Sequence, residues 1–257
     1  MRAPVLLLAL LLALGPVAGC SGDDEPEPAS GPGLPSQADL TSYFEAITGA
    51  DPDGLDRAQS DIAADGSLAQ GYAAYVAEYS VAAEAAGEAA DPVDVEEVDG
   101  GFKACIGESP DQCATWSDLK GQDGRLTDFS INDIGLDDLL VDLTGQPPVE
   151  SPGLYLVQPR WAYRQPKSGL LNVVVTVTAY DVALSPKRGI YIEEDQIIDG
   201  VKAPSPPTIE PGTSSPAVLA FPDAQDVALN GQITFDLDLQ GAGSESIGFG
   251  LADPAAS

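Results

Sequence analysis

The chain has 257 residues, of which 41 are acidic and 11 basic and none is histidine, so its formal net charge is −30. This charge makes nucleic acid and anionic lipid headgroups poor partners. Without histidine, Ser-His-Asp and Cys-His catalysis and the histidine-based zinc and iron sites are excluded. Carboxylate chemistry such as glycoside hydrolysis stays open, but the chain has only two tryptophans for sugar platforms. We therefore expect no enzymatic activity, no cofactor and no metal site.

The first residues have the three-part layout of a secretory signal. Arg2 supplies positive charge, residues 5–14 form an apolar run, and Gly15-Pro16 ends it. The run is too short for a permanent membrane-spanning helix, which needs about 20 residues. We expect residues 1–19 to be a signal peptide.

The end of this signal carries four informative residues, Val17, Ala18, Gly19 and Cys20. They resemble the lipobox of bacterial lipoproteins, which consists of an aliphatic residue, two small residues and a cysteine. The resemblance implies that the Cys20 sulfur takes a diacylglycerol and that Cys20 becomes the new N-terminus. Two acyl chains make membrane attachment stable where one would be marginal. The alternative is an ordinary signal peptide that happens to end in a cysteine.

The segment after the lipobox predicts a tether. Residues 21–36 are mostly Gly, Pro, Ser and acids, and Leu34 is their only large apolar residue. Such a segment cannot bury enough surface to fold, and its prolines keep it extended. We expect residues 20–36 to form a disordered acidic tether that lifts the body off the bilayer.

From residue 36 to about 87, apolar residues recur at helical spacing. Leu40, Phe44 and Ile47 form one series, and a second contains Leu68, Tyr72, Tyr75 and Tyr79. Ser36 and Ser67 are suited to begin the first and third helices, and Asp51-Pro52 the middle one. We predict three helices. The tyrosine stripe is interpreted as core that packs on a sheet, with a ligand-binding face as the alternative.

Short alternating segments from 91 to 131 predict antiparallel strands. Cys105 and Cys113 are the two cysteines that remain beside Cys20. Beyond the membrane they should form a disulfide across a hairpin or short bridged loop. A redox-active pair is the alternative. Asp123-Gly124 and the acids from 133 to 138 suggest a calcium site, but the EF-hand spacing is absent.

We therefore expect residues 37–132 to form an α+β domain of three helices followed by an antiparallel meander. This order resembles the NTF2-like and cystatin-like folds, on residues 113–119 (CATWSDL) and 123–130 (DGRLTDFS). The resemblance implies a cone between helices and sheet that in some members holds a small ligand.

The second half predicts an all-β domain. Residues 232–240 alternate cleanly between apolar and polar, which indicates one core face and one water face. In residues 170–180, Leu171, Val173, Val175 and Val177 face one way. Further strands are expected at 136–143, 153–163, 189–194, 216–221 and 246–251. Seven strands over residues 133–254 predict an immunoglobulin-like sandwich.

Four segments in this half carry a second resemblance: 173–180, 190–195, 209–212 (IEPG) and 217–222 (AVLAFP). They are similar to the immunoglobulin-like domain of secreted bacterial lipoproteins. Ala179-Tyr180 departs from that pattern, which has an Asn after the valine strand. The resemblance implies an extracytoplasmic interaction or spacer module.

Basic residues gather in one stretch of this half, around Trp161: Arg160, Arg164, Lys167, Lys187 and Arg188. We hypothesise that they contact a protein partner or an acidic polymer of the envelope. The alternative is that they are charges that keep a sheet edge from pairing with other chains.

Together these features predict a lipoprotein anchored to the extracytoplasmic face of the cell membrane. We expect it to be a non-catalytic interaction or structural module of the cell envelope. The alternative is a lipoprotein that binds a small ligand or solute in a cavity between the N-terminal helices and sheet. The richness in Ala, Gly and Asp resembles that of actinobacterial proteins.

Overall fold

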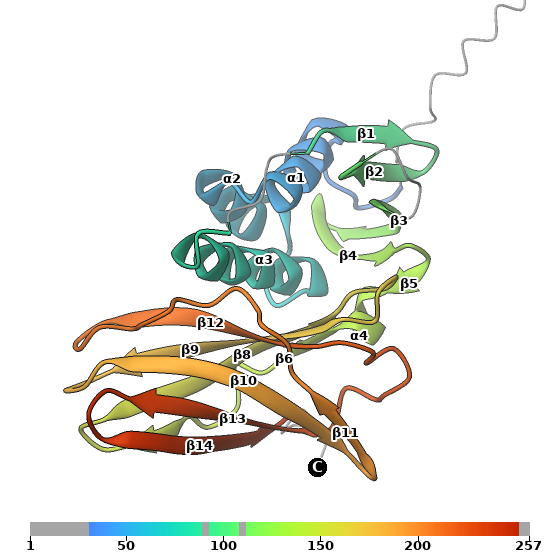
Figure 1. Ribbon diagram of the computed structural model, residues 1–257. Helices are drawn as coiled ribbons and strands as arrows, with labels where there is room; N and C mark the ends of the chain where they lie inside the picture. The colour runs from blue at the N-terminus through green and yellow to red at the C-terminus, as the bar shows by residue number, and fades with distance from the viewer. Residues whose placement is uncertain (1–30, 89–92, 108–111, 252–257) are drawn as a thin grey trace, which may run out of the picture.

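The computed structural model describes residues 31–88, 93–107 and 112–251. Its elements form an N-terminal group of helices on an antiparallel sheet, followed by a β-sandwich (Figure 1). Helix α3 lies across the outer face of the sandwich, between it and the other helices (Figure 1). The predicted combination of an α+β part and a β-sandwich is confirmed.

The three predicted helices are present, each with a polar N-cap. They are α1 (Gln37–Gly49), α2 (Pro52–Arg57), which continues into the π-helical turn η1 (Ala58–Ile62), and α3 (Leu68–Ala85). The side chains of Ser36, Asp51 and Ser67 each accept a hydrogen bond from a first-turn backbone N–H, at 3.2, 2.8 and 3.1 Å. These bonds satisfy donors that a helix start leaves without an intrahelical partner.

The first sheet is the predicted meander, in the order β1-β2-β3-β4-β5. Its strands are β1 (Val95–Val98), β2 (Gly101–Cys105), β3 (Cys113–Gln122), β4 (Arg125–Ile131) and β5 (Ile134–Gly135). Asp123-Gly124 and Asn132-Asp133 link β3 to β4 and β4 to β5, and all four residues have positive φ. Two-residue hairpin turns favour Asn, Asp and Gly for this reason. The described residues contain no group of three or more His, Cys, Asp or Glu suited to a metal.

The sandwich consists of two antiparallel sheets, ordered β12-β9-β8-β6, with β7 also on β8, and β11-β10-β13-β14. The strands are β6 (Leu140–Asp142), β7 (Val149–Ser151), β8 (Tyr155–Arg164), β9 (Leu171–Ala179), β10 (Leu184–Glu193), β11 (Gln196–Asp199), β12 (Ser214–Phe221), β13 (Gln232–Leu239) and β14 (Gly243–Gly250). In β13 the buried residues alternate with less buried ones, as predicted.

The strand predicted over 136–143 is wrong. Its first half is the helical turn α4 (Leu136–Leu139), and only the short β6 follows. Leu136, Leu139, Leu140 and Leu143 are all buried. Their offsets of three, four and seven residues are helical, and this spacing outweighs the apolar composition that suggested a strand.

Strand β9 is buried on both faces along its first half. The face of Val173, Val175 and Val177 points into the sandwich, as predicted. On the other face, Asn172 and Val174 are covered as well, and Val174 belongs to the same hydrophobic core as the helices. Leu140, Trp161, Tyr163 and Val218 of the sandwich belong to that core too. The helices and the outer face of one sandwich sheet therefore share one core, and a second core fills the sandwich.

Candidate functional site

The lipobox residues Val17, Ala18, Gly19 and Cys20 lie outside the described residues. The described end of the predicted tether is held on the body: Gly124 N donates to Gly33 O at 3.0 Å, and Leu34 packs against the helical core. Within the described parts of the chain, no helix has the length and apolarity needed to cross a membrane.

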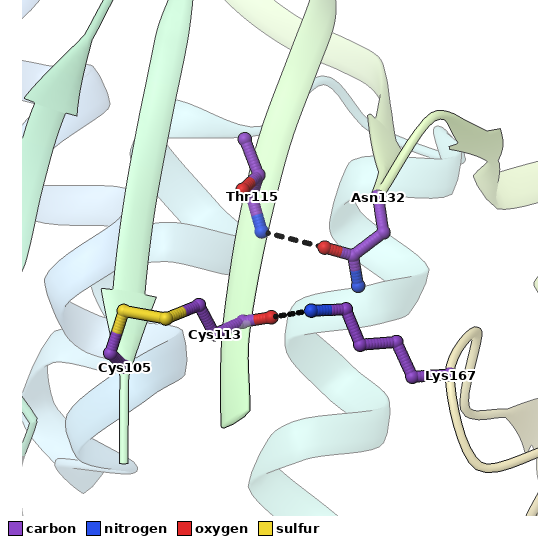
Figure 2. Close-up of a disulfide and its surroundings, with 5 residues drawn as sticks. All are labelled: Cys105, Cys113, Thr115, Asn132 and Lys167. Carbon is purple, nitrogen blue, oxygen red and sulfur yellow. Dashed lines mark hydrogen bonds between the residues drawn. A yellow bond between two sulfur atoms is a disulfide. The ribbon is translucent and has the colours of Figure 1, made fainter. Parts of the chain in front are cut away.

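The predicted disulfide between Cys105 and Cys113 is confirmed (Figure 2). The two residues are directly opposite each other in the β2–β3 pairing. Figure 2 shows Lys167 reaching this point from the loop between β8 and β9, where its Nζ donates to Cys113 O at 2.8 Å. On the same strand, Thr115 N donates to Asn132 Oδ1 at 3.1 Å. The disulfide end of the first sheet is thus tied to the sandwich.

Arg160 forms a two-pronged ion pair with Glu78 of α3. Its Nε and Nη2 donate to Glu78 Oε1 at 2.9 and 2.7 Å. The hydrogen bond and charge of Glu78 raise the pKa of Arg160. Both side chains are largely covered, with 33% and 21% of their surfaces exposed. Arg160 therefore joins the sandwich to α3.

Trp161 and Arg164 also make contacts within the chain. Trp161 is 6% exposed and lies against α3 at Gly71, where a Cβ atom would come within 3.1 Å of its ring. Arg164 donates to the backbone oxygens of Val227 and Asp138 at 2.7 and 3.1 Å. These residues hold neighbouring elements together.

The last two of the six predicted partner-binding residues are exposed. Lys187 and Arg188 lie in the bulge of β10, and Lys187 pairs with Asp238 at 2.7 Å. The structure thus spreads the six over β8, the β8–β9 loop and β10 rather than gathering them in one patch. Their contact with a partner stays a prediction.

The tyrosine stripe of α3 lies largely in the core, which confirms its interpretation as packing. Tyr72 and Tyr75 are buried, and both rings contact the ring of Tyr163 on β8, with centroids 5.3 and 4.9 Å away. Burial raises the pKa of Tyr72 to about 12. Asn172 of β9, also buried, donates to the Tyr75 hydroxyl at 3.5 Å. Tyr72 and Tyr75 are therefore closed to a ligand.

A groove of about 800 Å³ lies at the disulfide end of the first sheet, between the strand ends and the end of α1. It is lined by Thr48, Val93, Asp94, Glu96, Lys103, Ala104, Cys105, Ile106, Gln112, Ala114 and Trp116. Trp116 is 4% exposed, and its Nε1 has no hydrogen-bond partner among the residues that the structure describes. Ile106 is 84% exposed and stands at the groove as an uncovered apolar side chain. The volume of the groove falls within the range of small-molecule sites, about 300–1,000 Å³.

Sequence reasoning missed this groove because its residues come from four separated segments. The register places Ala104 opposite Ala114 and Phe102 opposite Trp116. Ala104 and Ala114 are the available signal: small residues in a sheet leave space beneath the helix that crosses it. The sequence alone does not reveal that they stand opposite each other.

Comparisons with known proteins give little further information. No protein-family profile matches the chain, and no curated protein does. Among solved structures, the chain is similar to a Bacillus subtilis subsp. subtilis str. 168 protein described as a "putative lipoprotein (ycdA)", at 13% identity and a TM-score of 0.29. The match covers 41% of this chain and 39% of that one, so the chain spans well under half of that protein. A likeness this weak carries no argument about fold or role.

Proposed function

We propose that this protein is a lipoprotein held on the extracytoplasmic face of the cell membrane, and that its folded body acts by binding rather than by catalysis. The observation that carries the proposal is the sequence Val17-Ala18-Gly19-Cys20 directly after a short apolar run. The cysteine arrangement supports it, because the disulfide uses Cys105 and Cys113 and leaves Cys20 as the third cysteine of the chain.

We further infer that the sandwich is immunoglobulin-like. In that fold, strands B and E pair in one sheet and strands C and F in the other. The non-sequential pairs β9·β12 and β10·β13 correspond to these, with β13·β14 as the final hairpin. Such a domain supports a role in interaction or spacing. This role agrees with the lack of histidine, which excludes histidine-based catalysis.

The test of the anchor is a comparison of the natural chain with Cys20→Ser in the producing cell. The natural chain should take up a metabolically supplied alkyne fatty acid and sediment with membranes. Cys20→Ser should lose the label and appear in the medium with the disulfide formed. Ser21→Ala serves as the matched control, because it alters the neighbouring residue and keeps the lipobox. A Cys20→Ser chain that stayed on the membrane would overturn the proposal.

The groove favours a second candidate function, the binding of a small molecule by the N-terminal part. This site differs from the cavity expected along the tyrosine stripe, because it opens at the disulfide end of the sheet and excludes those tyrosines. Saturable binding of a small apolar molecule by the folded chain is the measurement that tests it.

A further inference from the structure

Part of the wall of the groove is apolar. Ala104 and Ala114 face each other across β2 and β3, Trp116 lies two pairs further along, and Val93, just before β1, also lines the groove. A wall of this kind gains free energy when an apolar body covers it, about 25 cal/mol for each Å² removed from water.

The charges at the groove are unevenly balanced. Glu96 stands opposite Lys103 in the β1–β2 register, so one acid and one base offset each other. Asp94, which is exposed and lies just before β1, has no such partner. Among the described residues, none forms an ion pair with Asp94, Glu96 or Lys103. The net charge of the lining is therefore −1, in a chain of net charge −30 that attracts cations from a distance.

We propose that the groove binds a cationic amphiphile, with its apolar body against Val93, Ala104 and Ala114 and its positive group beside Asp94. The inference rests on the ligand-binding function proposed above and does not depend on lipidation at Cys20. The groove is at the Cys113 end of β3, whereas the tether meets the body at Gly124, just beyond the other end. A strand of this length spans about 30 Å, so the groove and this attachment point are at opposite ends of β3.

Three probes with the same alkyl chain separate the apolar and charge parts of the proposal: dodecyltrimethylammonium, dodecyl maltoside and dodecanoate, each below its micelle concentration. The protein is the mature chain with Cys20→Ser and Trp161→Phe, so that Trp116 is the only tryptophan. We expect saturable binding with a change in Trp116 emission, and calorimetry should give one site. The cationic probe should bind at least about fivefold more tightly than dodecanoate, and this ratio should fall as salt rises.

Two substitutions locate the site. Asp94→Asn should lower the affinity for the cationic probe about two- to fivefold, the range of an exposed charge pair. The affinity for dodecyl maltoside should not change. Ala114→Phe should fill the groove and abolish binding of all three probes. Asp195→Asn, an exposed acid on the sandwich hairpin, makes the same charge change as Asp94→Asn and should have no effect. Circular dichroism confirms that each variant is folded.

Each outcome has a separate meaning. Equal affinity for the three probes, or an Asp94→Asn variant that binds the cationic probe normally, would refute the preference for a cationic ligand. The groove would then still be a site for an apolar ligand. Absence of saturable binding by any probe, or binding that survives Ala114→Phe, would overturn both the site and the second candidate function. Neither result bears on the anchor, which the fractionation of Cys20→Ser tests separately.

Discussion

Replacement of Trp161 by alanine tests whether the helices and the sandwich fold as one unit. Trp161 belongs to β8 but is buried in the core that the helices share. A buried tryptophan reduced to alanine costs about 3–5 kcal/mol. If the shared core joins the two parts, this loss must appear in the N-terminal part as well as in the sandwich.

The variant supplies its own reporter, because Trp161→Ala leaves Trp116 of β3 as the only tryptophan. With a urea dependence of about 2–3 kcal/mol per molar, a loss of about 4 kcal/mol moves the midpoint down by roughly 1.5 M. The assay is urea unfolding followed by Trp116 emission and by far-ultraviolet circular dichroism. Trp161→Phe is the control, which retains an aromatic ring and should shift the midpoint much less.

The two probes should give coincident curves in both variants. A Trp116 transition that keeps the same midpoint in Trp161→Ala and Trp161→Phe would refute the reasoning. The helical part would then be stable without its contact to β8, and the shared core would be an association of two independent units.

Three other predictions follow from local contacts. Glu78→Gln and Arg160→Met should each lower the free energy of unfolding by about 1 kcal/mol, and the double variant should lose less than the sum, which a double-mutant cycle measures. Replacing Cys105 and Cys113 by serine should cost about 2–3 kcal/mol, because the disulfide closes a short loop; an unchanged melting temperature would contradict this. The raised pKa of Tyr72, about 12 in the fold against about 10 when unfolded, means that the unfolded chain loses its proton first as pH rises. The contribution of Tyr72 to the free energy of unfolding should thus be fully present below about pH 10 and fall by about 2–3 kcal/mol by pH 12. Absorbance at 295 nm should show that the buried tyrosines ionise together with unfolding.

The parts of the fold that depend on neighbouring residues were predictable. Ser36 and Ser67 act as caps because their hydroxyl groups meet N–H groups three residues on. The alternation of apolar and polar residues in β13 was clear because one face of that strand is buried and the other is more exposed. The disulfide followed from the number of cysteines and their expected compartment.

The parts that depend on distant residues were not predictable in the same way. The contact between Asn172 and Tyr75 joins residues 97 positions apart, and no period in either segment indicates it. The consecutive apolar residues Val173, Val174 and Val175 were the available signal, since a strand covered on both faces loses its alternation. For Arg160 and Arg164, sequence grouping suggested a surface patch, whereas the fold uses each one to bind a different neighbouring element.

The attachment of the tether also has a mechanical consequence. With the lipid anchor proposed at Cys20, a pulling force from the membrane would enter the described chain at the segment of residues 31–36. The hydrogen bond from Gly124 N to Gly33 O, the packing of Leu34 and the burial of Pro35 hold this segment in place, and Ser36 caps α1. Detachment of residues 31–35 would release roughly 17 Å of extended chain before the force reached the Ser36 cap of α1. Under the proposed anchor, this segment would therefore detach and extend before a pulling force unfolded either core.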